Sequence, residues 1–486
     1  MHAIALLLCL SLHQAPVDAA ANSEVDAGVA AVEPAPAPPP PAPTPPAPPK
    51  ESVLPPPFVS WDFVSTPWGP GRRNAGERFA STATLLPDSP LRWSWNGFQV
   101  SLGAQYIARF EGRDNLDLST AAQDQTLGVD QRARLSMRAS AKDFIGLQLD
   151  FQDVRPWADP VAGGASTTGL YQGFLDVHVA PWLDVRAGRQ ELAYGEERVL
   201  GAVDWAQAAR SFDGLFARVT ASKSFTLDAF AMVLKPPAWV TPTGGGNKFH
   251  NSGSYLTGLY SRTRIEKSGV DVYALGLFDD PATAATGLSK DNNHVTLGAR
   301  GFTTIAGLNV IAEGVFQTGK VGPQEALLLA GGGAVRATYT LSQVWGTPYI
   351  AAEFTFATPA MQRLFPTAHA VLGYADIVGW QNVVAERGAI GFRPWGAHVW
   401  LDVHHFNAWD PKAAWYLASG AVYLAADPNR TAGNMGTELD LSATVPLIPN
   451  VALAGSLTVF LPGDEAAAAK GRDVSTWGFL SIRAQL

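Results

Sequence analysis

Hydrophobic and polar residues alternate along most of the chain after Trp93, and turn-forming residues interrupt the alternation repeatedly. Between Asp130 and Ser140, every second residue is Asp, Arg or Ser, and the residues between them are mainly apolar. The segment from Thr437 to Val445 has the same pattern. Because successive side chains of a strand point to opposite faces, this pattern predicts strands with one apolar and one polar face.

About eighteen strands are predicted on this basis. They cover residues 98–111, 128–141, 143–154, 170–180, 182–192, 213–222, 224–234, 254–266, 268–279, 293–304, 307–318, 332–342, 347–358, 385–394, 396–407, 434–445, 448–460 and 475–486. Most are close to the roughly 9 to 11 residues that cross a bilayer at a tilt, whereas strands of soluble proteins more often have about 5 or 6. Their length therefore favours a membrane protein.

The predicted connections alternate between short and long. Tight joints fall at Lys142, Pro181, Lys223 and Lys267, near Ala306, Trp345 and Trp395, and at Ile448; long polar loops cover 112–127, 155–169, 193–212, 235–253, 279–292, 359–384 and 407–433. This alternation predicts an all-β fold: a single closed antiparallel transmembrane β-barrel with short periplasmic turns and long extracellular loops. A soluble sandwich or propeller is the alternative, but neither requires such alternation, and the chain shows no repeat of about 40 to 50 residues.

The first part of the chain predicts export rather than core structure. Residues 1–21 contain an apolar run followed by small residues and are interpreted as a signal peptide. Residues 22–57 form an Ala/Pro-rich linker that favours extended polyproline II, and 58–92 a periplasmic lead-in to the barrel, which spans 93–486. We therefore expect the protein in the bacterial outer membrane, surrounded by its lipid.

Composition excludes several classes of function. A formal net charge of −8 and a pI near 5.6 provide no basic surface for nucleic acid. The single cysteine, Cys9, lies in the predicted signal peptide, so no Cys-ligated metal site is expected. The common hydrolase, metalloprotease and phosphate-loop motifs are absent, and Gly244–Gly246 and Gly331–Gly333 are interpreted as loop tips. We predict neither an enzyme nor a cofactor.

The polar faces of the predicted strands carry many charges, which a barrel would turn toward its lumen. Arginines assigned to the pore lining are Arg109, Arg132, Arg134, Arg138, Arg186, Arg189, Arg218, Arg300, Arg336, Arg387, Arg393 and Arg483. Carboxylates accompany them, so most pairs could simply brace the wall, whereas unpaired guanidiniums at a constriction would favour anions. Arg132, Arg134 and Arg138 are the first candidates for selectivity. A lumenal His404 beside Asp402 is interpreted as a satisfied polar pair, and no metal site is predicted.

Tryptophans stand where strands meet turns or loops and could form interfacial girdles. They are Trp157, Trp182, Trp239, Trp345, Trp395, Trp409, Trp415 and Trp477. Packing beneath loops is the alternative for any one of them.

The stretch GRQELAYGEERVLGAVDWAQAARSFDG, from Gly188 to Gly214, resembles the hallmark segment of the alginate-export family of outer-membrane barrels. The matching residues are Gly188, Arg189, Gln190, Leu192, Tyr194, Gly195, Arg198, Asp204, Trp205, Arg210, Ser211, Phe212, Asp213 and Gly214. Segments Phe365–Asn382 and Asn434–Leu441, and VFLPGD at Val459–Asp464, resemble the same family. The chain departs from many outer-membrane barrels in ending on Leu486 rather than on an aromatic residue.

This resemblance implies an eighteen-stranded barrel that passes a polyanionic polysaccharide through an Arg-lined constriction. Residues expected to brace the barrel or carry the family motif are Gly188, Gln190, Glu191, Tyr194, Gly195, Arg198, Asp204, Trp205, Arg210, Asp213, Gly214, Glu438 and Asp440. We predict a passive outer-membrane channel for an anionic solute, such as an alginate-like uronate polysaccharide or an acidic oligosaccharide, with periplasmic export partners as a further expectation. The alternatives are a barrel enzyme such as a lipid hydrolase and a non-conducting barrel that binds or anchors.

Overall fold

The computed structural model describes residues 91–121, 124–142, 144–157, 166–236, 239–240, 248–249, 253–279, 292–322, 325–369, 371–448 and 450–485. The predicted signal peptide and linker lie outside these residues, as does the lead-in except for its last two residues. Those boundaries stay predictions.

A nineteen-stranded antiparallel sheet forms the fold. The short β1 (Arg92–Trp95) pairs only with the start of β2 (Phe98–Asp114). The others are β3 (Thr126–Ala141), β4 (Ile145–Pro156), β5 (Thr167–Ala180), β6 (Leu183–Gln190), β7 (Phe212–Thr220), β8 (Phe225–Lys235), β11 (Ser254–Ile265), β12 (Ser268–Asp279), β13 (Asn292–Ile305), β14 (Leu308–Val321), β15 (Ala326–Thr340), β16 (Tyr349–Ala357), β17 (Val383–Phe392), β18 (His398–Asn407), β21 (Asn434–Ile448), β22 (Val451–Pro462) and β23 (Ser475–Gln485).

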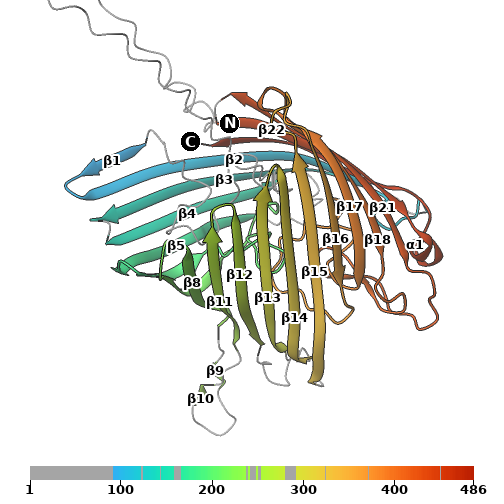
Figure 1. Ribbon diagram of the computed structural model, residues 1–486, viewed down its shortest axis with the longest axis horizontal. Helices are drawn as coiled ribbons and strands as arrows, with labels where there is room; N and C mark the ends of the chain where they lie inside the picture. Colours follow the sequence, from blue (N-terminus) through green and yellow to red (C-terminus); the bar gives the residue numbers. More distant parts are fainter. Residues whose placement is uncertain are drawn as a thin grey trace, which may run out of the picture. The chain divides into compact units, whose positions relative to one another are not determined.

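The last strand, β23, pairs with β2, and this contact closes the eighteen strands other than β1 into a barrel. Figure 1 shows the consequence, because the blue start of the sheet lies beside its red end. Closure leaves no strand of the barrel with a free edge. The predicted fold class is therefore confirmed.

Connections between strands alternate in length as predicted. At one end of the barrel the joints are short, for example residues 181–182 between β5 and β6 and 306–307 between β13 and β14. At the other end lie longer loops, including 191–211 after β6, 358–382 after β16 and 408–433 after β18. The exception at this end is the four-residue joint 322–325 between β14 and β15.

Three small elements occur within the long loops. The hairpins β9 (Trp239–Val240) with β10 (Lys248–Phe249) and β19 (Trp415–Tyr416) with β20 (Val422–Leu424) form separate two-stranded sheets. A short helix, α1 (Asp464–Ala469), follows β22. Within the described residues, no helix is both long enough and apolar enough to cross a membrane.

The two faces of the wall differ as the alternation requires. On β3, Leu135 is 66% exposed on the outer face, while its neighbours Arg134 and Ser136 are buried on the inner face. Large apolar side chains also stand on the outside of other strands, among them Leu175, Leu215, Leu259, Val272, Phe316, Ile350, Ile390, Leu441 and Leu457. An outer apolar band of this kind is the surface that a bilayer covers.

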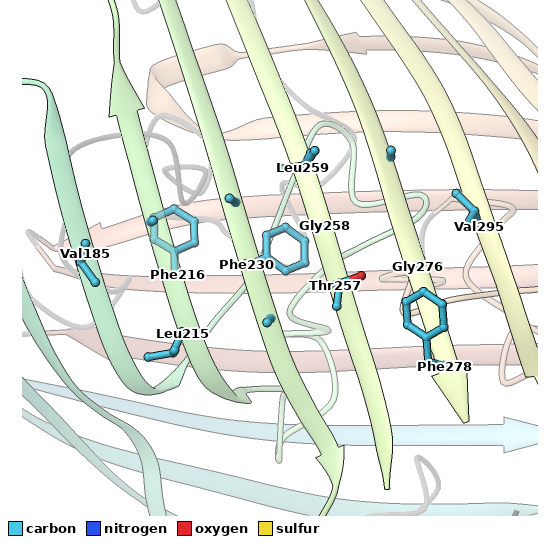
Figure 2. A pocket seen from close by; sticks show the side chains of 14 residues that line it. Val185, Leu215, Phe216, Phe230, Thr257, Gly258, Leu259, Gly276, Phe278 and Val295 are labelled. Atoms are coloured by element: carbon cyan, nitrogen blue, oxygen red, sulfur yellow. The ribbon is translucent and has the colours of Figure 1, made fainter. Parts of the chain in front are cut away.

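A shallow pocket belongs to this outer face and not to the lumen. Leu215, Leu259 and Phe278 stand among its lining residues (Figure 2) and are all exposed. Small outward residues such as Ala229 and Gly276 form part of its lining. The pocket is therefore a depression in the apolar wall.

Two details correct the sequence interpretation. Trp415 and Trp477 are 0% and 3% exposed, so neither stands in an interfacial girdle; they pack beneath loops or inside the barrel. Trp157, Trp182, Trp345, Trp395 and Trp409 are exposed at strand ends, and the side chain of Trp239 lies outside the described set.

The run Gly331–Gly333 lies within β15 rather than at a loop tip. A Cβ added to Gly332 would lie 2.7 Å from Met361 Sδ, so the absence of a side chain allows the loop after β16 to pack against the wall. Gly244–Gly246 lies outside the described residues.

Candidate functional site

Two long loops enter the barrel and contact each other there. Residues 191–211 and 358–382 join at a parallel bridge between Leu200 and Phe365. Backbone hydrogen bonds run from Phe365 N to Val199 O at 3.0 Å and from Gly201 N to Phe365 O at 2.8 Å. Apolar residues of both loops belong to one buried cluster, which includes Leu192, Val199, Leu200, Leu372 and Ile377. The loops therefore form one packed unit inside the wall.

The first of these loops presents Asp204 to three arginines of the wall. Its Oδ1 lies 3.0 Å from Arg132 Nη2 and 3.2 Å from Arg134 Nη1, and its Oδ2 lies 3.3 Å from Arg483 Nη2. All four side chains are at most 9% exposed. One buried carboxylate of the loop thus meets three guanidiniums of the wall.

Backbone and ring contacts hold the tip of this loop in place. Arg132 Nη1 donates to the carbonyl oxygens of Asp204 and Gln207 at 3.2 and 3.3 Å. Arg109 Nη1 donates to Trp205 O at 2.8 Å, and its guanidinium lies 4.0 Å from the centre of the Trp205 ring. Guanidiniums stack well on aromatic faces, so Arg109 fixes the residue next to Asp204.

A second group of charges attaches the start of the same loop to other strands. Glu196 pairs with Arg300 Nη2 at 2.8 Å and with Arg336, while Arg198 pairs with Glu353. Burial alone would raise the pKa of Glu196, but the guanidiniums of Arg336 and Arg300 lower it to about 2. Burial would lower the pKa of Arg198, yet Glu353 and Glu196 raise it above its ordinary value. Both groups are therefore charged at neutral pH.

The motif glycines and Tyr194 allow the loop to leave β6 and fold inward. Gly188 has φ +129°, and a Cβ there would lie 2.3 Å from Gly173 O of the adjacent strand. Gly195 has φ +58°, which side-chain-bearing residues seldom adopt. Between them, the Tyr194 hydroxyl donates to Asp228 Oδ2 at 3.1 Å and its ring stacks on Tyr260.

The remaining motif residues brace the loop and its neighbouring strands. Gln190 donates to the carbonyls of Gly188 and Gly214, Glu191 accepts from the Tyr171 hydroxyl, and Arg210 donates to Gly201 O and Pro366 O. Glu438 accepts the backbone N–H groups of Tyr374 and Ala375 in the second loop. Asp440 accepts from the Thr458 hydroxyl on the next strand.

The arginines expected in the pore lining fall into distinct groups. Arg109, Arg132, Arg134 and Arg483 converge on the loop tip. Arg138 lies apart and pairs with both oxygens of Asp176 at 2.9 and 2.8 Å. Within the wall, Arg218 pairs with Asp228 and Arg387 with Asp402. Arg300 pairs with Asp271 of the wall and Glu196 of the loop, and Arg336 pairs with Glu353 of the wall and the same Glu196.

Three arginines of the expected lining have other surroundings. Arg186 is buried with its guanidinium 3.9 Å from the Phe174 ring centre, and Arg393 follows β17 at the short-turn end, 5.1 Å from the Tyr349 ring centre. The assignment of Arg189 to the pore lining is wrong. Its side chain lies on the outer face, opposite to that of Arg186, where it is 43% exposed and pairs with Asp213 at 2.7 Å. Residues three apart in a strand face opposite sides, so both could not line the pore.

The sequence interpretation omitted Arg262 and Arg264, which continue the inner face of β11. Arg262 Nη2 lies 2.8 Å from Asp228 Oδ2, and Arg264 pairs with Asp271. The period-two alternation of β11 provided the signal that could have identified them, because they stand two and four residues beyond the inward Tyr260.

Solved structures with the same fold are outer-membrane porins and their relatives. Over 80% of this chain, the structure resembles Acinetobacter baumannii OccAB4 (TM-score 0.53, 12% identity, 98% of that chain). It also resembles Pseudomonas aeruginosa OccD3 (OpdP), with TM-score 0.52, 12% identity and 91% of that chain covered. For the outer membrane protein OprD from Pseudomonas aeruginosa, the values are 0.51, 8% and 93%, again over 80% of this chain. No curated protein matches the sequence.

Fold and interior together define a porin-type barrel of the bacterial outer membrane. Residues 98–478 match the family described as alginate export, and the chain belongs to that family.

Proposed function

We propose that this protein is a passive outer-membrane channel for an anionic solute, and that the solute is an alginate-like uronate polysaccharide or an acidic oligosaccharide. The observation that carries the proposal is the set of three wall arginines that bind Asp204. A uronate carboxylate has the same chemistry as an aspartate side chain, and guanidinium is the group best suited to bind it. Family membership supports the same solute class.

The arrangement suggests how an anion would be accommodated. Three guanidiniums surround the single loop carboxylate of Asp204, so a carboxylate of the solute could replace Asp204 as their partner. A polymer with a carboxylate on each sugar could pass from one guanidinium to the next without leaving any of them unpaired for long. Outer-membrane lipid would cover the apolar outer face, and periplasmic export partners would deliver the polymer.

Ion selectivity in planar bilayers tests the proposal. The reversal potential across a salt gradient is expected to indicate anion preference for the wild-type channel. Arg132→Glu with Arg134→Glu is expected to reduce or reverse that preference. Arg189→Glu is the matched control, since it changes the same charge on the outer face.

Cation preference of the wild-type channel would refute the proposal. So would an equal loss of anion preference in the double variant and in the Arg189 control.

A non-conducting barrel that binds or anchors is a second candidate, because the two loops pack together inside the wall. It predicts no conductance from the wild type or from any variant that loosens the loops. A barrel enzyme has no comparable supporting observation.

A further inference from the structure

A compact group of ionisable side chains stands on the inner wall, opposite the second loop. Asp402 and His404 alternate on β18, and Glu438 and Asp440 alternate on β21. The register places Asp402 opposite Asp440 and His404 opposite Glu438. All four residues are at most 2% exposed. Four inward side chains of adjacent strands therefore share one small, water-excluded patch.

Negative charge exceeds positive charge in this patch. Three of the four groups are carboxylates, and the nearest paired cation is Arg387, whose Nε and Nη2 lie 3.2 and 2.8 Å from the two oxygens of Asp402. Glu438 Oε1 is occupied by two backbone N–H groups of the loop, and Asp440 Oδ1 by Thr458. Buried carboxylates require compensation by protons or by a cation.

Two oxygens in the patch are left without a donor. Asp440 Oδ2 and Glu438 Oε2 accept no hydrogen bond from an N–H or hydroxyl group in the described part of the chain, although both residues are 0% exposed. The two carboxylates also lie within hydrogen-bonding reach of each other. Glu438 lies two residues from Asp440 on the same face of β21. Two buried carboxylates that approach each other, each with an oxygen that no N–H or hydroxyl reaches, require a proton or a cation between them.

The geometry of that set suits a metal ion. One ligand atom from each of Asp402, His404 and Asp440 lies within 4.8 Å of the other two. His404 Nε2 is 3.7 Å from Asp440 Oδ2. Neighbouring ligands of a tetrahedral ion with bonds of about 2.1 Å are separated by about 3.4 Å, so small side-chain movements would complete the contact.

We propose that Asp402, His404 and Asp440 bind a divalent transition-metal ion of the zinc type, with the Glu438 carboxylate as its neighbour. A mixed imidazole and carboxylate set favours such an ion over Ca²⁺ or Mg²⁺, which prefer oxygen ligands alone. The ion neutralises the excess charge of the patch. Glu438 also accepts hydrogen bonds from the backbone N–H groups of Tyr374 and Ala375, so the ion would stabilise the position of the second loop against the wall. The proposal does not depend on which solute the channel passes.

Metal content of the purified, folded barrel tests the site directly. Protein stripped with a chelator, reloaded with Zn²⁺ and passed through a desalting column is expected to retain about one ion per chain, in the presence of excess Ca²⁺ and Mg²⁺. His404→Asn and Asp440→Asn are expected to weaken retention by at least about tenfold. His294→Asn is the matched control, because it removes another buried imidazole from the inner wall.

Absence of bound zinc in the wild type would overturn the proposal and leave protons as the compensating charges. Equal retention by the His404 and Asp440 variants would also overturn it, because the ion would then be held elsewhere. If those variants do not fold, the visible spectrum of Co²⁺ added to the wild-type protein tests whether the proposed site binds a metal ion. A spectrum of imidazole and carboxylate coordination supports the site, and the spectrum of hydrated Co²⁺ alone contradicts it.

Discussion

Replacing Asp204 with asparagine is expected to release the inserted loop and increase conductance. The substitution keeps the shape of the side chain but removes the negative charge that Arg132, Arg134 and Arg483 share. Each of these arginines is buried, so each loses a charged partner without gaining water in return. The loss is specific to the docked loop, because only that state brings Asp204 to the arginines.

The magnitude follows from the burial of the pair. Removing one partner of a buried ion pair costs about 3 to 5 kcal/mol. Since about 1.4 kcal/mol corresponds to a tenfold change, the ratio of docked to released loop should fall roughly 100-fold to a few thousand-fold. Backbone contacts with the second loop remain in place, for example Gly201 N to Phe365 O. Release would therefore be a shift in population and would not unfold the barrel.

Single-channel recording measures this shift as conductance or open probability, and Asp213→Asn is the control. Asp213 pairs with Arg189 on the outer face and is 53% exposed, so its ion pair contributes only about 0 to 1 kcal/mol. The reasoning is refuted if Asp204→Asn conducts like the wild type. An equal increase in the Asp213 variant would refute it as well.

Two further predictions concern this loop and the strand β6 that leads into it. The folded pKa of Glu196, about 2, lies below its ordinary value of 4.5, so its stabilisation of the docked loop is complete above pH 4.5 and is lost as the pH falls toward 2. Open probability should therefore rise on acidification below 4.5 and stay flat above it, and Glu196→Gln should remove this dependence. Gly188→Ala should lower barrel stability by about 1 to 3 kcal/mol in urea titration, because φ there is +129° and the added Cβ meets Gly173 O. Gly314→Ala, where a Cβ meets nothing within 4 Å, should have a much smaller effect.

The barrel itself could be predicted from the sequence because its determinants are local. Each strand can be recognised from the alternation of apolar and polar residues over about ten positions, and each turn from the turn-forming residues within it. The inner face of β3 was therefore predictable, and Arg132 and Arg134 do lie on it. Arg189 was assigned wrongly by departing from the same rule, since it stands three positions from Arg186.

The partners within the lumen could not be predicted in this way. Asp204 lies 70 residues from Arg134 and 279 from Arg483 in the sequence. The loop between β6 and β7 has no regular alternation of apolar and polar residues that would predict whether it folds into the lumen. Trp477 shows the same limit, because its ring contacts Trp205 only after that loop has folded inward. Such contacts depend on the closed wall, which brings together residues that are far apart in the sequence.

The concentration of charge between Gly188 and Gly214 follows from this insertion. The acids Glu196 and Asp204 each meet at least two wall arginines, so the loop is complementary in charge to the lumen that it enters. A polyanionic solute of the proposed kind would compete with those carboxylates for the same arginines. Loop and solute would then be alternative occupants of one site, and each would weaken the binding of the other. A loop that keeps the guanidiniums paired when no polymer is present would close the channel, and a polymer of sufficient charge would open it.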